Sequence, residues 1–528
     1  MPAFVTEQFR ILNTTNFVNS IDNGTDNYYI FVGLPNPTTA GFGRSSTWDI
    51  GDPNVTNPVI PDPTDNIDYL PHYANTMLYG RKVTPSNVRR CIRRIPWTKG
   101  IKYDMYRHDY SSTNLSPNSN RPRLYDSDYY VINSQYQVYI CISNGSTGTD
   151  PTGNESLDEP TFTDLEPSKA GTQGDGYIWK YLFSVLPSDV VKFDSTEFIP
   201  LPNDWDDTST NAQVQAIRNN ADSRINKNQI KKVFIERSGP SGAYLSGEVD
   251  IIGDGSGGRV YITVNESGQI EDATVTSGGS GYTYAIVDLE PLRTTDTFSS
   301  DPAKLIPIIP PSFGHGYDLY RELGAEKVFM YVRMDDSTKD FPTDTKFAQI
   351  GVLKNPLKNV SNSNFTDDSF NATYSLKVTL PQGSVSPVIG TKIRQKVPNG
   401  EAEAYIASYD SVTGVLKYFQ DRSLQYSLST NDQSDYAGIS SSGKLFQFEG
   451  SNPINGDAND FVAYIDTSFD GSELQLTDRV VNLGSSFISG VSQPEINKTS
   501  GDIIFIDNRA LVTRNSRQKE DIKIVLEF

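Results

Sequence analysis

The sequence predicts a mainly β, multi-domain protein with β-sandwich-like domains and a few helices. Three observations favour this class. The chain has 528 residues, more than a single hydrophobic core ordinarily serves. Its 40 glycines and 31 prolines fall between short, alternating apolar segments, as in strands joined by turns. Its 29 tyrosines and 25 phenylalanines supply large rings to fill several small cores.

Strands are expected where apolar and polar residues alternate between Gly, Asn, Asp and Pro. In chain order these segments are 28–32, 129–142, 230–235, 260–264, 374–380, 402–409, 415–419 and 503–506. Their number and even spread along the chain predict several small sheets.

One clear helix is expected over 210–226, with Ser209 or Thr210 as its N-cap. Its apolar residues recur at three- and four-residue spacing on one face: Val214, Ile217, Ala221 and Ile225. A weaker helix is predicted over 86–94, where two apolar residues stand four apart. The helical content should therefore be small.

Residues 239–281 are rich in glycine and contain a weak internal repeat. A Ser-Gly motif that begins at Ser238 returns at Ser277, and each copy is followed by a Val-Asp pair. Two strand–turn units, each opening on glycines that supply positive φ, would explain the repeat. This stretch is predicted to be a small inserted β module.

A second distinct stretch opens with a polar linker at 359–371 and contains several expected strands. Residues 427–442 within it are so polar that an exposed loop is expected. We therefore predict a discontinuous core interrupted by two inserted β modules. The core comprises 1–228, 301–359 and 496–528, and the modules comprise 229–300 and 360–495.

The composition argues against several classes of function. A net charge of −19 and a pI near 4.7 disfavour a nucleic-acid or anionic-membrane binder. Two cysteines, Cys91 and Cys141, build no disulfide framework. The start lacks a Sec-type signal pattern, and the most apolar stretch, 305–311, is too short to span a membrane. We expect neither export by that route nor a membrane span.

The histidines and cysteines suggest no reactive centre. His72, His108 and His315 are far apart in sequence and form no zinc-binding pattern. His315 lies between two glycines, where a tight loop with a packed or capping histidine is expected. Cys91 is flanked by arginines that would lower its pKa, but nothing places a base, so a small buried side chain is expected.

The carboxylates are numerous but carry no specific signal. Three pairs stand close in sequence: Asp126 with Asp128, Asp206 with Asp207, and Asp335 with Asp336. Sequence adjacency is no sign of two carboxylates facing each other across a sugar cleft. The run that begins at Asp254 lacks the twelve-residue calcium loop ending in Glu. We expect no catalytic residues, no metal and no cofactor, and hence no enzyme.

One local charge anomaly is basic. Between Arg81 and Arg107 there are nine cations against one acid, Asp104. Such a patch should bind an acidic surface of a neighbouring subunit or pair with this chain's own carboxylates; a nucleic-acid surface is the weaker alternative. The candidate inter-subunit contact comprises Arg89, Arg90, Arg93 and Arg94.

Eight stretches carry a resemblance to a known family through their order along the chain. They are 9–21, 27–33, 77–86, 92–97, 174–183, 347–357, 500–509 and 521–528. The first begins Phe9-Arg-Ile-Leu-Asn-Thr-Thr-Asn-Phe, and the fifth reads Gly174-Asp-Gly-Tyr-Ile-Trp-Lys-Tyr-Leu-Phe. Together they resemble the baseplate wedge protein of the gene product eight family in T-even-type contractile-tail phages, in its cyanophage-like version.

The resemblance covers roughly 1–205, 305–357 and 496–528 and says nothing about the two inserted modules. It implies a non-catalytic, mostly β virion subunit of the tail baseplate, assembled in the host cytoplasm. It also implies a homodimer in each of six wedges that contacts other wedge proteins and moves on sheath contraction. Two alternatives remain: a carbohydrate-binding or depolymerase-type tail protein, and another virion connector such as a neck protein.

Overall fold

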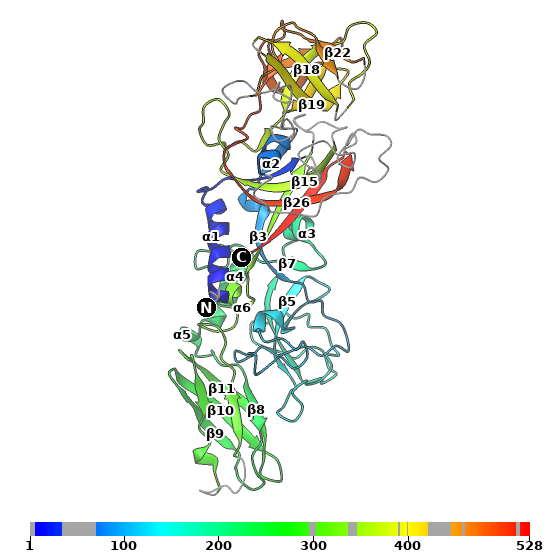
Figure 1. Ribbon diagram of the computed structural model, residues 1–528. Helices are drawn as coiled ribbons and strands as arrows, with labels where there is room; N and C mark the ends of the chain where they lie inside the picture. Colours follow the sequence, from blue (N-terminus) through cyan, green and yellow to red (C-terminus); the bar gives the residue numbers. More distant parts are fainter. Residues whose placement is uncertain are drawn as a thin grey trace, which may run out of the picture. The chain divides into compact units, whose positions relative to one another are not determined.

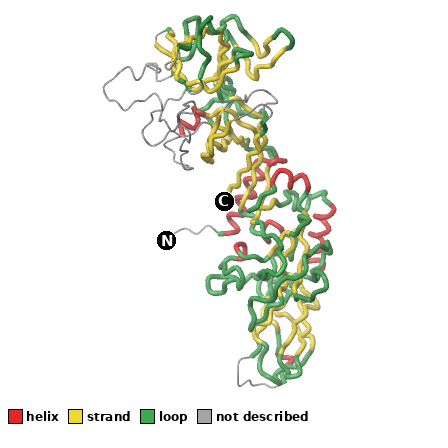
Figure 2. The backbone as a smooth tube through the Cα atoms, turned by 90° about the vertical axis from the view of Figure 1, so that its right-hand side faces the viewer, coloured by secondary structure: helices red, strands yellow, loops and turns green. Residues whose placement is uncertain are grey.

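The computed structural model describes residues 6–33, 70–294, 302–335, 346–388, 391–398, 400–420, 445–456, 460–513 and 518–528. Strands make up 41% of the chain and helices 13%, which confirms the predicted mainly β, multi-domain class (Figures 1 and 2). The chain divides into two compact units. The first comprises Met1–Val18, Val88–Met330 and Val525–Phe528, and the second comprises Asn19–Asn87 and Tyr331–Ile524.

The helical elements are few and mostly short. They are α1 (Glu7–Asp22), α2 (Leu70–Thr76), α3 (Pro187–Phe193), α4 (Ala212–Ala221), α5 (Ser223–Asn226) and α6 (Leu319–Glu322), with 3₁₀ turns at Pro85–Asn87, Leu124–Asp126 and Glu290–Leu292.

The strands run through both units. In the first part of the chain they are β1 (Tyr28–Gly33), β2 (Met77–Lys82), β3 (Val88–Arg93), β4 (Tyr130–Ile132), β5 (Gln137–Asn144), β6 (Tyr177–Ser184), β7 (Phe198–Pro200), β8 (Val233–Arg237), β9 (Gly247–Gly253), β10 (Ser256–Val264), β11 (Ile270–Ser280), β12 (Ala285–Val287), β13 (Lys304–Pro307) and β14 (Lys327–Met334). They continue with β15 (Lys346–Lys354), β16 (Ser369–Asn371), β17 (Tyr374–Thr379), β18 (Lys392–Val397), β19 (Gly400–Asp410), β20 (Val415–Phe419), β21 (Ile454–Gly456), β22 (Val462–Ile465), β23 (Gly471–Gln475), β24 (Val480–Phe487), β25 (Val491–Ser492), β26 (Asp502–Thr513) and β27 (Glu520–Glu527).

The largest core of the first unit surrounds the antiparallel sheet β4-β5-β6. Strand β5 is buried along almost its whole length, so side chains on both of its faces lie in the core. The ring of Trp179 stacks on Tyr177 with centroids 5.2 Å apart, and Tyr103 meets Trp179 edge-on at 5.9 Å. Aromatic rings thus supply the core volume that the composition predicts.

The Gly-rich stretch folds as a small two-layer β module in the first unit. Its sheet has the order β11-β10-β9-β12, and the pair β8–β13 contributes Val233 and Leu305 to the same buried cluster (Figure 1). Along β9 buried and exposed residues alternate, so one face points into the cluster. Gly239 and Gly279, in the two copies of the internal repeat, have φ of 80° and 61°. The predicted positive φ of these glycines is therefore confirmed, although Gly279 lies within strand β11 and not in a turn.

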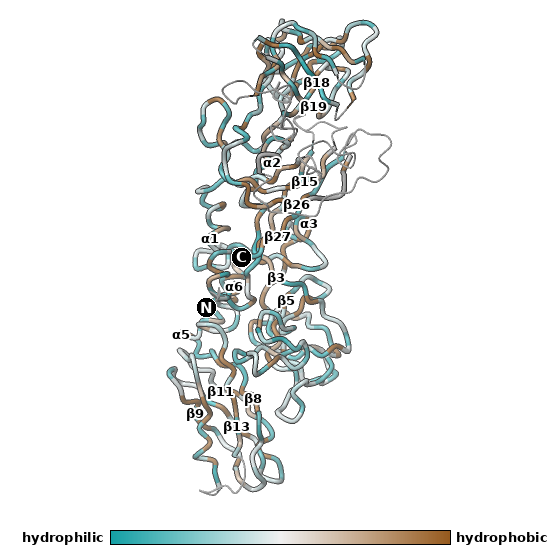
Figure 3. Tube along the Cα trace, in the orientation of Figure 1, coloured by the Kyte–Doolittle hydropathy of each residue, from teal (hydrophilic) through white to brown (hydrophobic). Residues whose placement is uncertain are grey.

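The second unit contains a five-stranded sheet and a closed one. The five-stranded sheet has the order β16-β2-β1-β15-β26, and every residue of β1 is buried. In the closed sheet, six strands follow the order β20-β19-β18-β21-β22-β17, and β17 pairs again with β20 through Tyr374 and Tyr418. Apolar side chains fill the barrel, among them Leu376, Ile393 and Leu416. Hydrophobic and hydrophilic residues are mixed along the strands of these β regions (Figure 3).

Several sequence predictions are corrected by the structure. The helix predicted over 86–94 is wrong, because Pro85–Asn87 is a 3₁₀ turn and Val88–Arg93 is strand β3, paired with β7 and β14. The helix predicted over 210–226 exists but is divided at Asp222, and its N-cap is Asn211.

Two further segments differ from expectation. The 16-residue helix α1 was not predicted. The polar linker at 359–371 contributes Phe365 and Phe370, whose rings pack on Tyr29 of β1 at 5.7 and 5.5 Å. The loop expected at 427–442 lies outside the described residues. The predicted module boundaries stay a prediction.

Candidate functional site

The four arginines of the predicted inter-subunit contact lie on and just after strand β3, and three of them form ion pairs with this chain's own carboxylates. Nε of Arg89 lies 3.0 Å from Oδ2 of Asp189, a buried residue of α3. Nη1 of Arg94 lies 2.6 Å from Oδ1 of Asp194. Pairing within the chain, one alternative left open by the sequence, is therefore what these side chains show.

Arg93 and Arg90 differ sharply in exposure. Nη2 of Arg93 lies 2.8 Å from Oδ1 of Asp128 and donates to the carbonyl oxygen of Asp126 at 3.0 Å, yet its side chain remains 42% exposed. Arg90 is only 3% exposed, with its guanidinium 4.1 Å from the centre of the Tyr320 ring. The side chain of Arg90 therefore packs inside the first unit, whereas the side chain of Arg93 is partly exposed to solvent. The contact with a neighbouring subunit stays a prediction.

Arg93 and Arg94 line a cleft of about 460 Å³. Its other lining residues combine aromatic rings with charges of both signs: Tyr125, Asp126, Tyr130, Glu197, Phe198, Glu326 and Lys327 among them. Glu326 lies at the centre of an ion-pair network, because its Oε2 is 3.2 Å from Nη2 of Arg123 and 3.7 Å from Nη1 of Arg10. The aromatic rings and arginines of this lining are residue types enriched at protein–protein interfaces, whereas its acidic residues and Lys327 are types depleted there.

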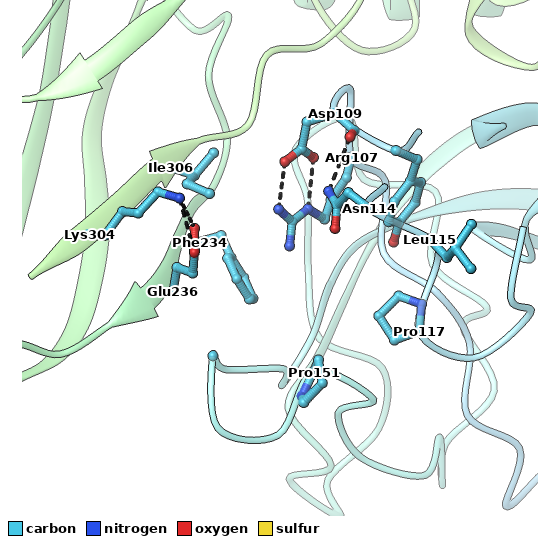
Figure 4. Close-up of a pocket in the computed structure, with 12 residues that line it drawn as sticks. Arg107, Asp109, Asn114, Leu115, Pro117, Pro151, Phe234, Glu236, Lys304 and Ile306 are labelled. Atoms are coloured by element: carbon cyan, nitrogen blue, oxygen red, sulfur yellow. Dashed lines mark hydrogen bonds and ion pairs between the residues drawn. The ribbon is translucent and has the colours of Figure 1, made fainter. Parts of the chain in front are cut away.

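A second cleft, of about 560 Å³, lies between the loops after Arg107 and the β8–β13 pair (Figure 4). The guanidinium of Arg107 binds the carboxylate of Asp109 with two contacts of 2.9 and 2.7 Å and lies 4.4 Å from the Phe234 ring centre. Burial raises the pKa of the Asp109 carboxyl, but the Arg107 guanidinium outweighs it and holds that pKa below its usual range. On the facing strands, Nζ of Lys304 lies 2.7 Å from Oε2 of Glu236. The charges in this cleft therefore also pair locally.

His315 packs in a tight loop, as predicted. Gly314 and Gly316 on either side have φ of 113° and 94°. The buried Nδ1 of His315 lies 2.6 Å from Oε1 of Glu322, and the imidazole meets the Tyr106 ring edge-on at 4.8 Å. This is a structural cluster in the core of the first unit.

His108 and both cysteines show no sign of a reactive centre. Nδ1 of His108 accepts a hydrogen bond from the Ile309 amide at 3.1 Å, and partial desolvation of the ring lowers the His108 pKa. The side chain of His72 lies outside the described residues. Cys91 and Cys141 are both fully buried, and burial raises the pKa of each thiol, which disfavours the reactive thiolate. The expectation that Cys91 is a small buried side chain is confirmed.

The acidic residues that stand in close pairs in the sequence interact with other residues of this chain. Asp206 accepts from the Thr208 amide at 2.7 Å, Asp207 contacts Arg218, and Oδ1 of Asp335 lies 3.9 Å from Arg81. Asp336 lies outside the described residues. Over the part of the chain that the structure describes, three or more His, Cys, Asp or Glu residues nowhere gather as metal ligands.

Asp254, which opens the acidic Gly-Ser run, caps a turn. Its carboxylate accepts from the Thr283 hydroxyl at 2.5 Å and the Thr283 amide at 2.8 Å. The Thr283 hydroxyl, followed by that amide, lowers the pKa of Asp254 to about 2.

Several buried ionisable residues were not predicted from the sequence, and Lys180 is one of them. Lys180 occupies the middle of the apolar strand β6 and is 1% exposed. A lysine inside a run of aromatic and apolar residues was the available signal, because lysine is seldom fully buried.

The fold and these clefts define a β-rich, multi-domain protein with mixed-charge, partly aromatic surfaces. No family model matches the chain. The chain is similar to the "Baseplate wedge protein gp8" of Enterobacteria phage T4, with 28% identity over 222 residues. The matched region covers 38% of this chain and 60% of that protein, so the chain spans less than two thirds of the relative's length. The similarity relates the chain to phage baseplate proteins.

Within the described residues, no helix is both long and apolar enough to cross a membrane.

Proposed function

We propose that this chain is a non-catalytic structural subunit of a contractile phage tail baseplate wedge. The observation that carries the proposal is the 222-residue similarity to the wedge protein of phage T4. The cleft beside Arg93 and Arg94 supports it, since arginines and aromatic rings are residue types enriched at contacts with neighbouring proteins. In this proposal the subunit holds neighbouring wedge proteins together and moves with the baseplate when the sheath contracts.

The proposal includes the assembly around the chain. Its partners are other baseplate wedge proteins, and two copies form a homodimer within each of six wedges. It resides in the virion, is assembled in the host cytoplasm, and requires no cofactor, nucleic acid or membrane.

A cryo-electron microscopy map of the intact tail tests this proposal. We expect density matching both compact units in the baseplate, in two copies per wedge. Density at the neck instead would identify another virion connector, and absence from the tail would exclude both assignments. Co-expression with the other wedge proteins of the same phage provides a second readout, because the subunit should elute with them during size-exclusion chromatography.

The carbohydrate-binding alternative is favoured by one observation. In the Gly-rich module, Tyr261 and Tyr284 are 44% and 63% exposed, and exposed rings are typical of surfaces that bind amphipathic partners. A glycan array and a polysaccharide digestion assay with the purified chain distinguish the two functions. Binding or depolymerisation would favour the alternative, whereas the wedge proposal expects neither.

A further inference from the structure

Lys180 presents a buried amine to a carboxamide. Its Nζ donates to the carbonyl oxygen of Leu165 at 2.5 Å and to Oδ1 of Asn220 in α4 at 3.5 Å. Burial is the main cause that lowers the pKa of Lys180 to about 8, with the nearby Lys231 ammonium second. A substantial fraction of the amine is therefore neutral near pH 8, and a neutral amine is a nucleophile.

The carboxamide of Asn220 is held in turn by a carboxylate. Nδ2 of Asn220 donates to Oε1 of Glu166 at 2.9 Å, and the other oxygen, Oε2, lies 2.6 Å from Nζ of Lys231. An amine, a carboxamide and a carboxylate thus follow one another in a connected series. The three residues come from β6, α4 and the loop before β6.

The amine is also close to the carbon that it would attack. Because a C=O bond is about 1.23 Å long, Nζ of Lys180 lies within about 4.7 Å of Cγ of Asn220. Reacting atoms in a near-attack arrangement lie about 3–3.5 Å apart. If this hydrogen bond breaks and the side chains shift by roughly one ångström, Nζ of Lys180 comes within that distance of Cγ of Asn220.

We propose that Lys180 and Asn220 form an intramolecular isopeptide bond, with Glu166 as the proton carrier. Nζ of the neutral Lys180 amine attacks Cγ of Asn220, and the new C–N bond gives a tetrahedral intermediate. Glu166 accepts a proton from Nζ and delivers it to Nδ2. The Cγ–Nδ2 bond then breaks, ammonia leaves, and a secondary amide joins the side chains with no change in oxidation state.

The site supplies what this reaction needs. The amine is fixed and shut off from bulk water, so the reaction is intramolecular and hydrolysis is suppressed. Glu166 is more than half exposed and faces solvent, which gives the departing ammonia a way out. The product would tie strand β6 covalently to helix α4 and restrict the unfolded chain. The inference rests on these contacts and is independent of the proposed function.

Intact mass spectrometry of the full-length purified protein tests the proposal. The expected mass, after allowing for the initiator methionine, is lower than the sequence mass by one ammonia molecule. A protease digest should yield a branched peptide in which Lys180 and Asn220 are joined. An intact mass equal to the sequence mass would overturn the proposal. A linear peptide carrying the same loss, the mark of an asparagine succinimide, would overturn it equally.

Substitutions of Lys180, Asn220 and Glu166 test the role of each residue in forming the bond. Lys180→Met and Asn220→Ala should each restore the sequence mass, and Glu166→Ala should slow the mass loss at least tenfold in a time course after synthesis. The matched controls are the exposed neighbours Lys169→Met and Asn219→Ala, which should keep the loss. Formation at the wild-type rate in Glu166→Ala would contradict the role of the carboxylate. The wild-type measurement decides the bond itself even where a variant fails to fold.

Discussion

Oε1 of Glu322 lies 2.6 Å from Nδ1 of His315, and both side chains are almost completely buried, at 0% and 2% exposure. The second carboxylate oxygen, Oε2, accepts from the Gly316 amide at 2.5 Å. One carboxylate thus organises a loop whose glycines need positive φ. The Tyr129 hydroxyl also donates to the Glu322 carbonyl oxygen at 2.7 Å. The His315 loop, helix α6 and the segment before strand β4 therefore meet at Glu322.

Replacing this carboxylate should destabilise the first unit. Glu322→Ala leaves the His315 imidazole without its partner and the Gly316 amide without its acceptor, and each buried polar group left unsatisfied costs about 1–3 kcal/mol. Calorimetry should show a lower unfolding temperature, and hydrogen exchange should accelerate around Gly316. The control is Arg321→Ala at the exposed neighbour, expected to change stability by less than about 1 kcal/mol. Equal effects of the two variants would contradict the structural role.

Of the arginines on β3, we expect Arg90 to be needed for folding and Arg93 to be needed for assembly. Arg90→Glu places a carboxylate in the interior under Tyr320 and should prevent folding or cost more than about 3 kcal/mol. Arg93→Gln removes an exposed ion pair worth about 1 kcal/mol or less, so the fold should survive.

The assembly readout for Arg93→Gln is co-elution with the other wedge proteins, which should weaken. Arg259→Gln is the matched control, because Arg259 is an exposed arginine paired with Glu248. If Arg93→Gln assembles as well as wild type, the predicted inter-subunit contact is wrong.

Gly80 of β2 is expected to tolerate no side chain. A Cβ there would lie 2.2 Å from Cζ of Phe370, whose ring is fully buried against Tyr29. Gly80→Ala should therefore cost about 1–3 kcal/mol through overpacking, seen as a lower urea midpoint of the second unit. Adding Phe370→Leu should recover part of that loss, and additive effects of the two substitutions would argue against the clash.

The turn capped by Asp254 should weaken in acid. Its folded-state pKa of about 2 lies below the ordinary 3.8, so its stabilising contribution is present above pH 4 and is lost as the pH falls toward 2. The protection factor of the Thr283 amide, which is its exchange rate relative to the unstructured rate at the same pH, should fall over that range, measured by NMR. Asp254→Asn should remove this dependence on pH. A carboxyl that titrates near 3.8 would show that the cap is absent in solution.

The predicted strands were reliable where a local pattern matched the environment it creates. Alternation along Val260–Val264 gave one buried and one exposed face in β10, as period-two patterning requires. The segment Val88–Arg93 misled because two apolar residues four apart share a face in a helix and in a strand alike. The segment is a strand because it pairs with β7 and β14 in an antiparallel sheet.

Helix α1 was missed for a different reason. Asn and Thr are abundant in it, and their side chains compete for backbone groups, so the sequence reads as irregular. In the fold, the Thr14 hydroxyl instead bonds the Arg10 carbonyl oxygen within the helix, and Phe17 packs 5.2 Å from Phe528. Tertiary packing outweighed the weak propensity.

The mainly β class, the multi-domain character, the positive-φ glycines and the resemblance to a baseplate protein could be predicted without a structure, because they depend on composition, local periodicity and the order of motifs. Which charges pair with one another became known only from the fold. The carboxylates that bind Arg89 and Arg94 each stand 100 residues away, and the amide facing Lys180 stands 40 residues away. Pairing over such separations depends on chain topology, which local sequence patterns do not encode.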